Sequence, residues 1–174
     1  MSQESLSPVA ETAVAFGTRL ASSQAFKDLF REGMSLVEET AAYLDGPGRN
    51  DSRSLDRGPA LAYATESMRL TTRLMQLASW LLLQRAVNEG ELTQEQAAQE
   101  KSKVRLSSVG APTPQSTLDE LPEQLSALIG KAMRLQERIV HMDKLLFAEI
   151  APPTAANAIS SQIDLLANAF GARR

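Results

Sequence analysis

The segment from Asp56 to Leu92 constrains the fold most, because it reads as one long helix with apolar residues around nearly its whole circumference. Three seams run along it. The first comprises Leu61, Ala64, Met68, Thr71, Met75, Ala78 and Leu82, the second Leu70, Leu74, Leu77 and Leu81, and the third passes from Glu66, Arg69, Arg73 and Gln76 to Trp80, Leu83 and Val87. One partner helix covers a stripe of only about 100°. We therefore expect this helix to be buried on more than one side.

Two further segments carry helical periodicity. In Gln24–Leu44, residues Phe26, Phe30, Gly33, Val37, Thr40 and Leu44 recur at spacings of four and three. In Leu118–Glu149, a heptad pattern is formed by Leu118, Leu121, Leu125, Leu128, Ala132, Leu135, Ile139, Met142 and Leu146. No run of alternating β-branched residues predicts a sheet. The sequence predicts an all-α fold, a three-helix antiparallel bundle with up–down–up order, short extra helices and a flexible C-terminal tail. Gly33 should mark a close approach of two helices.

Helix-starting and helix-breaking residues divide the chain. Ser7-Pro8 can open a short helix that ends near Leu20, and Ser22 or Ser23 can cap the next one. The run Asp45-Gly-Pro-Gly should stop that helix, and Arg49 to Leu55 should form a polar link. Thr93 to Gln96 has the pattern of a capping box. We expect an N-terminal helical arm at 1–22, a bundle at 23–150 with a connector at 104–117, and a tail at 151–174 with a short amphipathic segment.

Composition excludes several classes of function. The net charge of −3 argues against nucleic acid as a partner, since phosphate binding requires a basic surface. The chain has no cysteine, so disulfides and thiolate metal sites are excluded and a cytoplasmic location is the default expectation. The N-terminus lacks the basic region of a secretory signal. The longest apolar run, Leu74 to Leu83, is about half a membrane span, so we expect a soluble protein without membrane insertion.

The sequence offers few candidates for catalysis. His141 is the only histidine, at a heptad position that faces away from the seam, and it reads either as a surface residue or as a phosphoryl-accepting histidine with Lys144 nearby. A metal site in a bundle needs Glu-x-x-His pairs on facing helices, which one histidine cannot supply. We therefore expect no enzyme activity, no metal and no cofactor.

Two regions of the chain are candidate surfaces for contacts with other proteins. Arg69 and Arg73 follow Glu66 at helical spacing, so they form either a charge network within the helix or a grip on a partner's carboxylates. Trp80, Leu83 and Val87 continue this stripe, and either the connector or another subunit must cover them. We predict self-association through this helix, with a dimer or partner surface comprising Arg69, Arg73, Trp80, Leu83 and Val87.

The second region is the tail. Beyond Pro152 and Pro153, a narrow apolar stripe comprises Ile159, Ile163, Leu166 and Phe170. Such a segment either folds back on the bundle or binds a groove on another protein, and we predict that it is a docking segment.

Two strings carry a resemblance to a known family. FREGMSLVEETAAYLDGPGR (Phe30 to Arg49) and ALAYATESMRLTTRLMQLASWLLLQRAVNEGEL (Ala60 to Leu92) strongly resemble the alphaproteobacterial family of the regulator of CtrA degradation, once catalogued as a domain of unknown function. The resemblance implies a dimeric three-helix bundle without enzyme activity. It implies an adaptor that tethers substrates, such as the cell-cycle regulator CtrA, to the ClpXP protease, with other adaptors as further partners. The residues alone leave two alternatives: a histidine phosphotransfer protein and a purely structural dimer.

Overall fold

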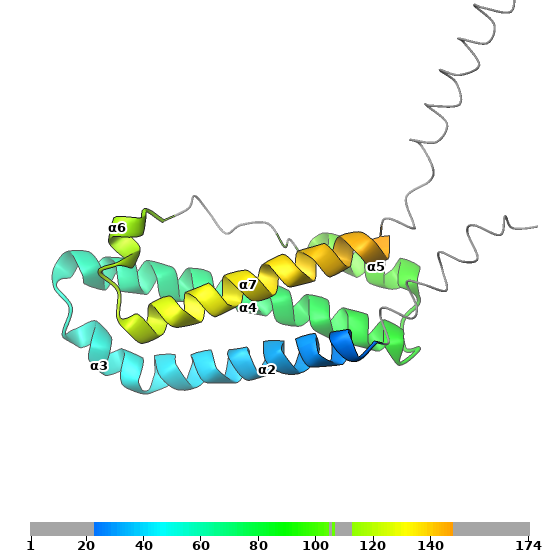
Figure 1. The fold of residues 1–174 in the computed structure, drawn as a ribbon, viewed down its shortest axis with the longest axis horizontal. Helices are drawn as coiled ribbons and strands as arrows, with labels where there is room; N and C mark the ends of the chain where they lie inside the picture. Colours follow the sequence, from blue (N-terminus) through cyan, green and yellow to red (C-terminus); the bar gives the residue numbers. More distant parts are fainter. Residues whose placement is uncertain (1–22, 105, 107–112, 148–174) are drawn as a thin grey trace, which may run out of the picture.

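The computed structural model describes residues 23–104, 106 and 113–147, in which every regular element is an α-helix. Three long helices pack together: α2 (Gln24–Asp45), α4 (Arg57–Asn88) and α7 (Glu123–Phe147). Three short ones lie at the ends of the bundle, as Figure 1 shows: α3 (Pro47–Arg53), α5 (Gln94–Lys103) and α6 (Gln115–Leu118). The predicted all-α bundle with short extra helices is confirmed.

The predicted helix starts at Ser23, Asp56 and Thr93 are found, whereas the start predicted at Ser7-Pro8 lies outside the described residues. Ser23 caps α2, because its Oγ accepts a hydrogen bond from the backbone N–H of Phe26 at 3.3 Å. Helix α4 follows Asp56 and carries Pro59 in its first turn, where a missing N–H does no harm. Thr93 and Gln96 form both bonds of the capping box of α5.

The polar link predicted at Arg49 to Leu55 is wrong, because most of it is helical. Pro47 occupies the first position of α3, so it starts a helix there after Gly46 has ended α2. Tyr43 holds α3 in place through a hydrogen bond from its hydroxyl to the Asp51 carboxylate at 2.9 Å. This contact joins side chains of two helices, so the turn-forming residues in the sequence do not predict it.

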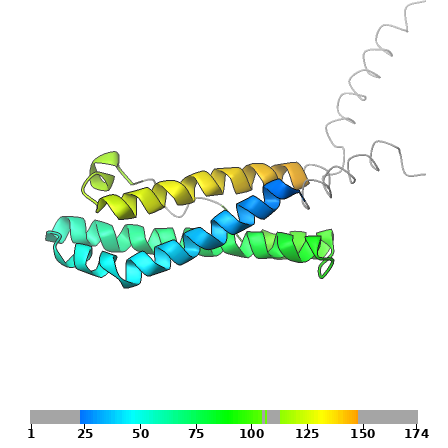
Figure 2. The same ribbon diagram turned by 60° about the horizontal axis from the view of Figure 1, so that its bottom comes forward.

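Helix α2 runs antiparallel to both other long helices (Figure 2). Against α7, Glu39 pairs with Lys131 at 2.7 Å, whereas the earlier residue Glu32 pairs with the later residue Arg138 at 2.6 Å. These ion pairs are half-exposed, so each contributes at most about 1 kcal/mol to stability. Their order shows that α2 and α7 run in opposite directions.

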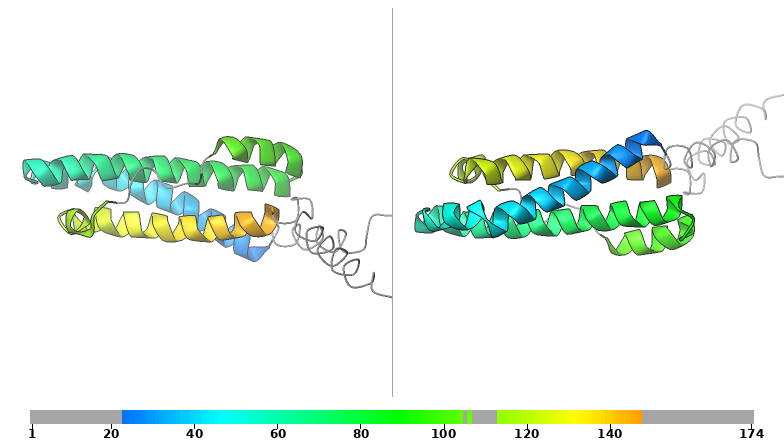
Figure 3. Two further views of the ribbon diagram at one scale, coloured as in Figure 1. Left: turned by 90° about the horizontal axis from the view of Figure 1, so that it is seen from above. Right: turned by 90° about the horizontal axis from the view of Figure 1, so that it is seen from below.

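Helices α4 and α7 are parallel, so the predicted up–down–up order is wrong for α7. Arg73 contacts Gln136 and Trp80 contacts Asp143, so later residues of one helix meet later residues of the other. Figure 3 shows the two helices running the same way. The reason is the intervening chain: α5 folds back along the end of α4, and α6 lies near the opposite end, from which α7 starts.

The core lies where the three long helices meet. It contains the second seam of α4 and most of the α7 heptad, packed on the inner face of α2. Fully buried members include Leu70, Leu77, Leu81, Leu125, Leu128, Leu135 and Ile139. Helix α7 begins at Glu123 instead of Leu118, because Pro122 cannot lie inside a helix. Leu118 and Leu121 still pack on the core from α6 and the following turn.

Glycines allow two close approaches in this core. At Gly33 a Cβ atom would overlap the Cδ1 of Leu81, which confirms the predicted contact between helices. At Gly48 a Cβ atom would lie 2.8 Å from the carbonyl oxygen of Tyr43 and 2.5 Å from the hydroxyl of Tyr63. A backbone atom cannot move aside as a side-chain end can, so Gly48 sets the distance between α2 and α3.

We therefore expect Gly48→Ala to lower the free energy of unfolding by about 1 to 3 kcal/mol, the usual cost of overpacking. Gly58→Ala is the matched control, because nothing lies within 4 Å of a Cβ atom there. That change should leave stability equal or raise it by up to about 1 kcal/mol, since alanine favours the helix. Urea unfolding of both variants measures the difference. Equal stabilities would contradict the packing described at Gly48.

Candidate partner-binding surfaces

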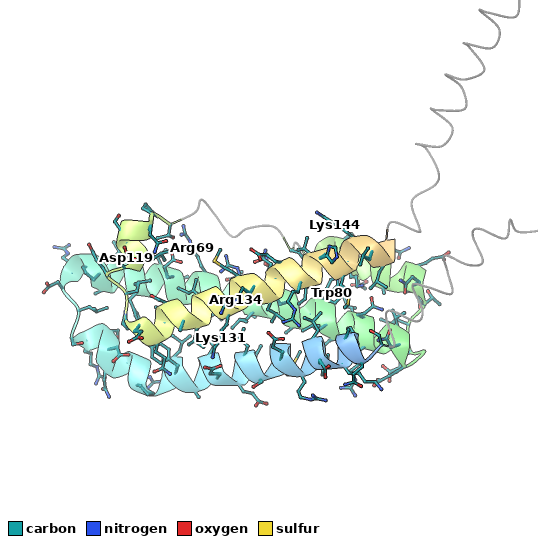
Figure 4. All side chains as sticks on the ribbon, viewed as in Figure 1. Arg69, Trp80, Asp119, Lys131, Arg134 and Lys144 are labelled. Carbon is teal, nitrogen blue, oxygen red and sulfur yellow. The ribbon has the colours of Figure 1, made fainter. Side chains whose placement is uncertain are left out.

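The third seam of α4 begins at Glu66, which is a buried carboxylate with 6% of its surface exposed. Arg69 donates to it from Nη1 at 2.8 Å, and the Thr113 hydroxyl donates to the same oxygen. Arg69 also donates to the Thr113 oxygen. The charge network within the helix is therefore present, and a residue of the connector closes it. In Figure 4 Arg69 lies at the end of the bundle near α6.

One turn further, Arg73 joins α4 to α7. Its Nε donates to the Oε1 of Gln136 at 2.7 Å, and the amide of Gln136 donates to the carbonyl oxygen of Leu106 at 2.8 Å. Burial lowers the pKa of Arg73, and the neighbouring Glu66 carboxylate opposes that shift. Arg73 thus holds the connector against both helices through one bridging glutamine.

The side chain of Trp80, a residue of α4, points towards α7 and has 1% of its surface exposed (Figure 4). Its indole N–H donates to the Asp143 carboxylate at 2.6 Å. Lys101 of α5 covers the ring, with its Nζ 4.4 Å from the ring centroid, and donates to the Oε1 of Gln84 at 2.6 Å. The same ammonium lies 3.9 Å from Asp143. The Gln84 oxygen, the face of the Trp80 ring and the Asp143 carboxylate compensate the buried charge of Lys101.

The prediction that Trp80 belongs to a partner surface is therefore wrong. Helix α5 covers it, because Lys101 can spread its aliphatic stem over the ring and satisfy its charge there. Leu83 and Val87, which follow on the same seam, are half-buried. Arg69 and Arg73 are engaged by the chain's own residues, so this seam is occupied within one chain.

Most of the exposed large apolar side chains in the described residues lie on the first seam of α4. Four large side chains, spaced seven residues apart, are more than half exposed: Leu61 (71%), Met68 (72%), Met75 (66%) and Leu82 (52%). We call these four residues the outer stripe. Small residues lie between them, including Ala64, Thr71, Thr72 and Ala78. A continuous apolar stripe on a helix is typical of a protein-binding surface, unlike single exposed leucines. The sequence predicts this seam as an apolar stripe of the helix, but it does not indicate that this seam is the exposed one.

The other expectations from the sequence concern His141, metal binding, membrane insertion and the two ends of the chain. His141 is exposed on α7, beside a shallow groove of about 420 Å³ between α7 and the start of α2. In the part of the chain that the structure describes, no three His, Asp or Glu residues gather into a potential metal site. None of the described helices is long and apolar enough to cross a membrane. The tail residues Ile159, Ile163, Leu166 and Phe170 lie outside the described residues, as does the N-terminal arm.

The class of protein that these features define is an all-α helical bundle with an exposed apolar stripe on α4. The profile of the family described as "Protein of unknown function (DUF1465)" matches residues 17–170, so the chain belongs to this family. Among solved structures, it is similar to the crystal structure of RcdA from Caulobacter crescentus CB15. The two share 51% identity and a TM-score of 0.61, over 74% of this chain and 96% of that one. No curated protein matches the chain.

The buried ammonium makes stability depend on pH. Burial lowers the pKa of Lys101 from 10.5 to about 8, partly opposed by Asp143. At pH values between these two pKa values, Lys101 binds more protons in the unfolded chain than in the folded chain. The free energy of unfolding therefore rises with pH from about 8 towards 10.5. We expect the free energy of unfolding to gain about 2 kcal/mol between about pH 7.5 and 9.5 relative to Lys101→Met, at about 1.4 kcal/mol per pH unit above the folded pKa.

Urea unfolding of both proteins at these two pH values measures this gain, and the variant cancels the contributions of all other groups. Lys103→Met is the matched control, because Lys103 is exposed on the same helix. Parallel pH profiles for the wild-type chain and Lys101→Met would contradict the buried ammonium.

Proposed function

We propose that this chain is a non-enzymatic adaptor that tethers regulatory substrates, such as the cell-cycle regulator CtrA, to the ClpXP protease in the cytoplasm. The observation that carries the proposal is the 51% identity to RcdA across 96% of that chain. The uncovered apolar face of α4 supports it, since an adaptor acts through surfaces. A tether raises the effective concentration of a substrate near the protease without lowering a chemical barrier.

The adaptor is further proposed to be a homodimer that pairs through the outer stripe. The stripe is self-complementary: about a two-fold axis between Thr71 and Thr72, Leu61 would face Leu82 of a second copy and Met68 would face Met75. A spacing of seven residues suits two helices that pack along a seam. The stripe is about 32 Å long at the rise of an α-helix. A hollow of about 310 Å³ beside Met68, Thr71 and Thr72 gives room for a methionine of the second copy.

We expect the double change Met68→Glu and Met75→Glu to yield a folded monomer, because four charges would face one another across the two-fold axis. Both side chains are already exposed in one chain, so the bundle should keep its helix content. Met133→Glu is the control, since Met133 is 48% exposed on α7 and away from the stripe. Analytical ultracentrifugation at micromolar concentration separates the outcomes. A wild-type monomer, or a dimer that survives the double change, would rule out this interface.

Degradation of CtrA by purified ClpXP, with and without this chain, tests the adaptor function directly. We expect the full chain to accelerate degradation in the presence of the other adaptors. Deleting residues 154–174 should abolish this effect yet leave the melting temperature nearly unchanged, because a docking tail buries no area on the bundle. The matched control keeps the tail but replaces exposed Glu95 of α5 with Gln.

Five results would count against the proposal. Equal degradation with and without the chain would remove the adaptor function. Full activity of the shortened chain would make the tail dispensable, and a large fall in its melting temperature would make the tail part of the core. Phosphorylation of His141 by a histidine kinase, lost in His141→Gln, would favour phosphotransfer. A chain that retains no protease component in a pull-down would be a structural dimer.

A further inference from the structure

A groove lies along the first half of α2, on the side that faces the end of α4. It has a volume of about 770 Å³ and is lined by Phe26, Phe30 and Met34, with Ser35, Glu38 and Arg85 among its polar neighbours. The Phe26 and Phe30 rings lie 6.3 Å apart, and the Arg85 guanidinium covers one side of Phe30 at 5.3 Å. Phe30 and Met34 are only half-buried, so an apolar strip remains open to solvent.

The spacing of this strip suits a helix. Phe26, Phe30 and Met34 lie four residues apart on one face of α2, so they form a ridge against which a second helix can pack. From Phe26 to Glu38 the groove is about 18 Å long at the helical rise of 1.5 Å per residue. Its charged rim is balanced, because Arg31 pairs with Asp28 and Arg85 pairs with Glu89. The occupant should therefore be apolar with little net charge.

The segment that precedes α2 has this character. Between Ser7 and Ser23 its apolar residues recur at helical spacings of four, three and four, as Val9, Ala13, Phe16 and Leu20. A helix from Pro8 to Leu20 would be about 20 Å long, which matches the groove. Its only charged residues are Glu11 and Arg19, so its net charge is close to zero.

The N-cap of α2 determines how this segment can reach the groove. Ser23 has extended backbone angles, φ −68° and ψ 160°, and its side chain caps the helix. A helix that ends at Leu20 therefore cannot continue straight into α2, because the chain changes direction at Ser23. Ala21, Ser22 and Ser23 form a link of the length that joins two antiparallel helices.

We propose that residues 8–20 form a helix that packs antiparallel to α2 in this groove, as an additional helix of the bundle. Leu20 then lies opposite Phe26, Phe16 opposite Phe30, and the small residue Ala13 near the longer side chain of Met34. The tail is a weaker candidate, because 11 residues separate Phe147 from Ile159 and a longer link costs more entropy on closure. A second copy is accommodated by the outer stripe on another face of α4. This arm position is independent of the adaptor function.

Cysteine cross-linking in the full-length chain tests the proposal, because the chain has no cysteine of its own. Thr12→Cys is combined with Ser35→Cys, on the groove rim, and treated with a short bismaleimide. The control pair combines Thr12→Cys with Ser102→Cys, which is exposed on α5 at the same end of the bundle but away from α2. We expect an intramolecular cross-link in the first pair, its absence in the second, and its loss when Phe16→Asp is added.

Each other outcome overturns the proposal. Equal cross-linking of both pairs, or none in either while the helix content is unchanged, would mean that the arm does not occupy the groove. A cross-link only between chains would make a second copy the occupant. A stronger cross-link between Leu166→Cys and Ser35→Cys would make the tail the occupant. The readout needs no protease, so it succeeds or fails separately from the degradation assay.

Discussion

The fold depends on the burial of α4 on two sides at once. Its second seam, centred on Leu74 and Leu77, enters the core, and its third seam from Glu66 to Trp80 lies under the connector and α5. Helix α7 meets the third seam at Arg73 and Trp80, and the connector and α5 cover the rest of it. The chain covers it by sending α5 and the connector back along α4, and the parallel pairing of α4 with α7 follows from that path.

Polar contacts help to fix this path. Glu66 with Thr113, Arg73 with Gln136, and Lys101 with Gln84 lie one after another along α4, and each engages the connector or a helix beside it. Buried polar groups stabilise one arrangement mainly because every alternative would leave them without partners. The seam that is partly polar in sequence is therefore covered by polar contacts from the connector and α5, whereas the second seam enters the core and the outer stripe stays exposed.

This division of the α4 surface has a consequence for function. Once α2, α7 and α5 have covered their sides, the outer stripe holds four of the six large apolar side chains that are exposed in the described residues. Its residues add nothing to the core of one chain, so changes there can alter association without unfolding the bundle. In the proposed adaptor, binding through this face and through the tail would keep stability and interactions separate.

The sequence by itself determined the three long helices and the inner face of α7, because helical periodicity, the caps at Ser23 and Thr93 and the α7 heptad are local properties of the chain. On α2 it placed Phe30 and Val37 on the inner face, where the structure buries Leu29, Leu36 and Tyr43. It also determined that α4 has more apolar surface than one neighbour can cover. Only the tertiary structure decided which seam stays exposed, because Met68 and Leu74 look equally apolar in sequence. It likewise decided that Trp80 is buried and α7 parallel to α4, since both depend on where a connector of low periodicity places Lys101 and Thr113. Side-chain contacts between residues distant in sequence carry that information, and local patterns do not.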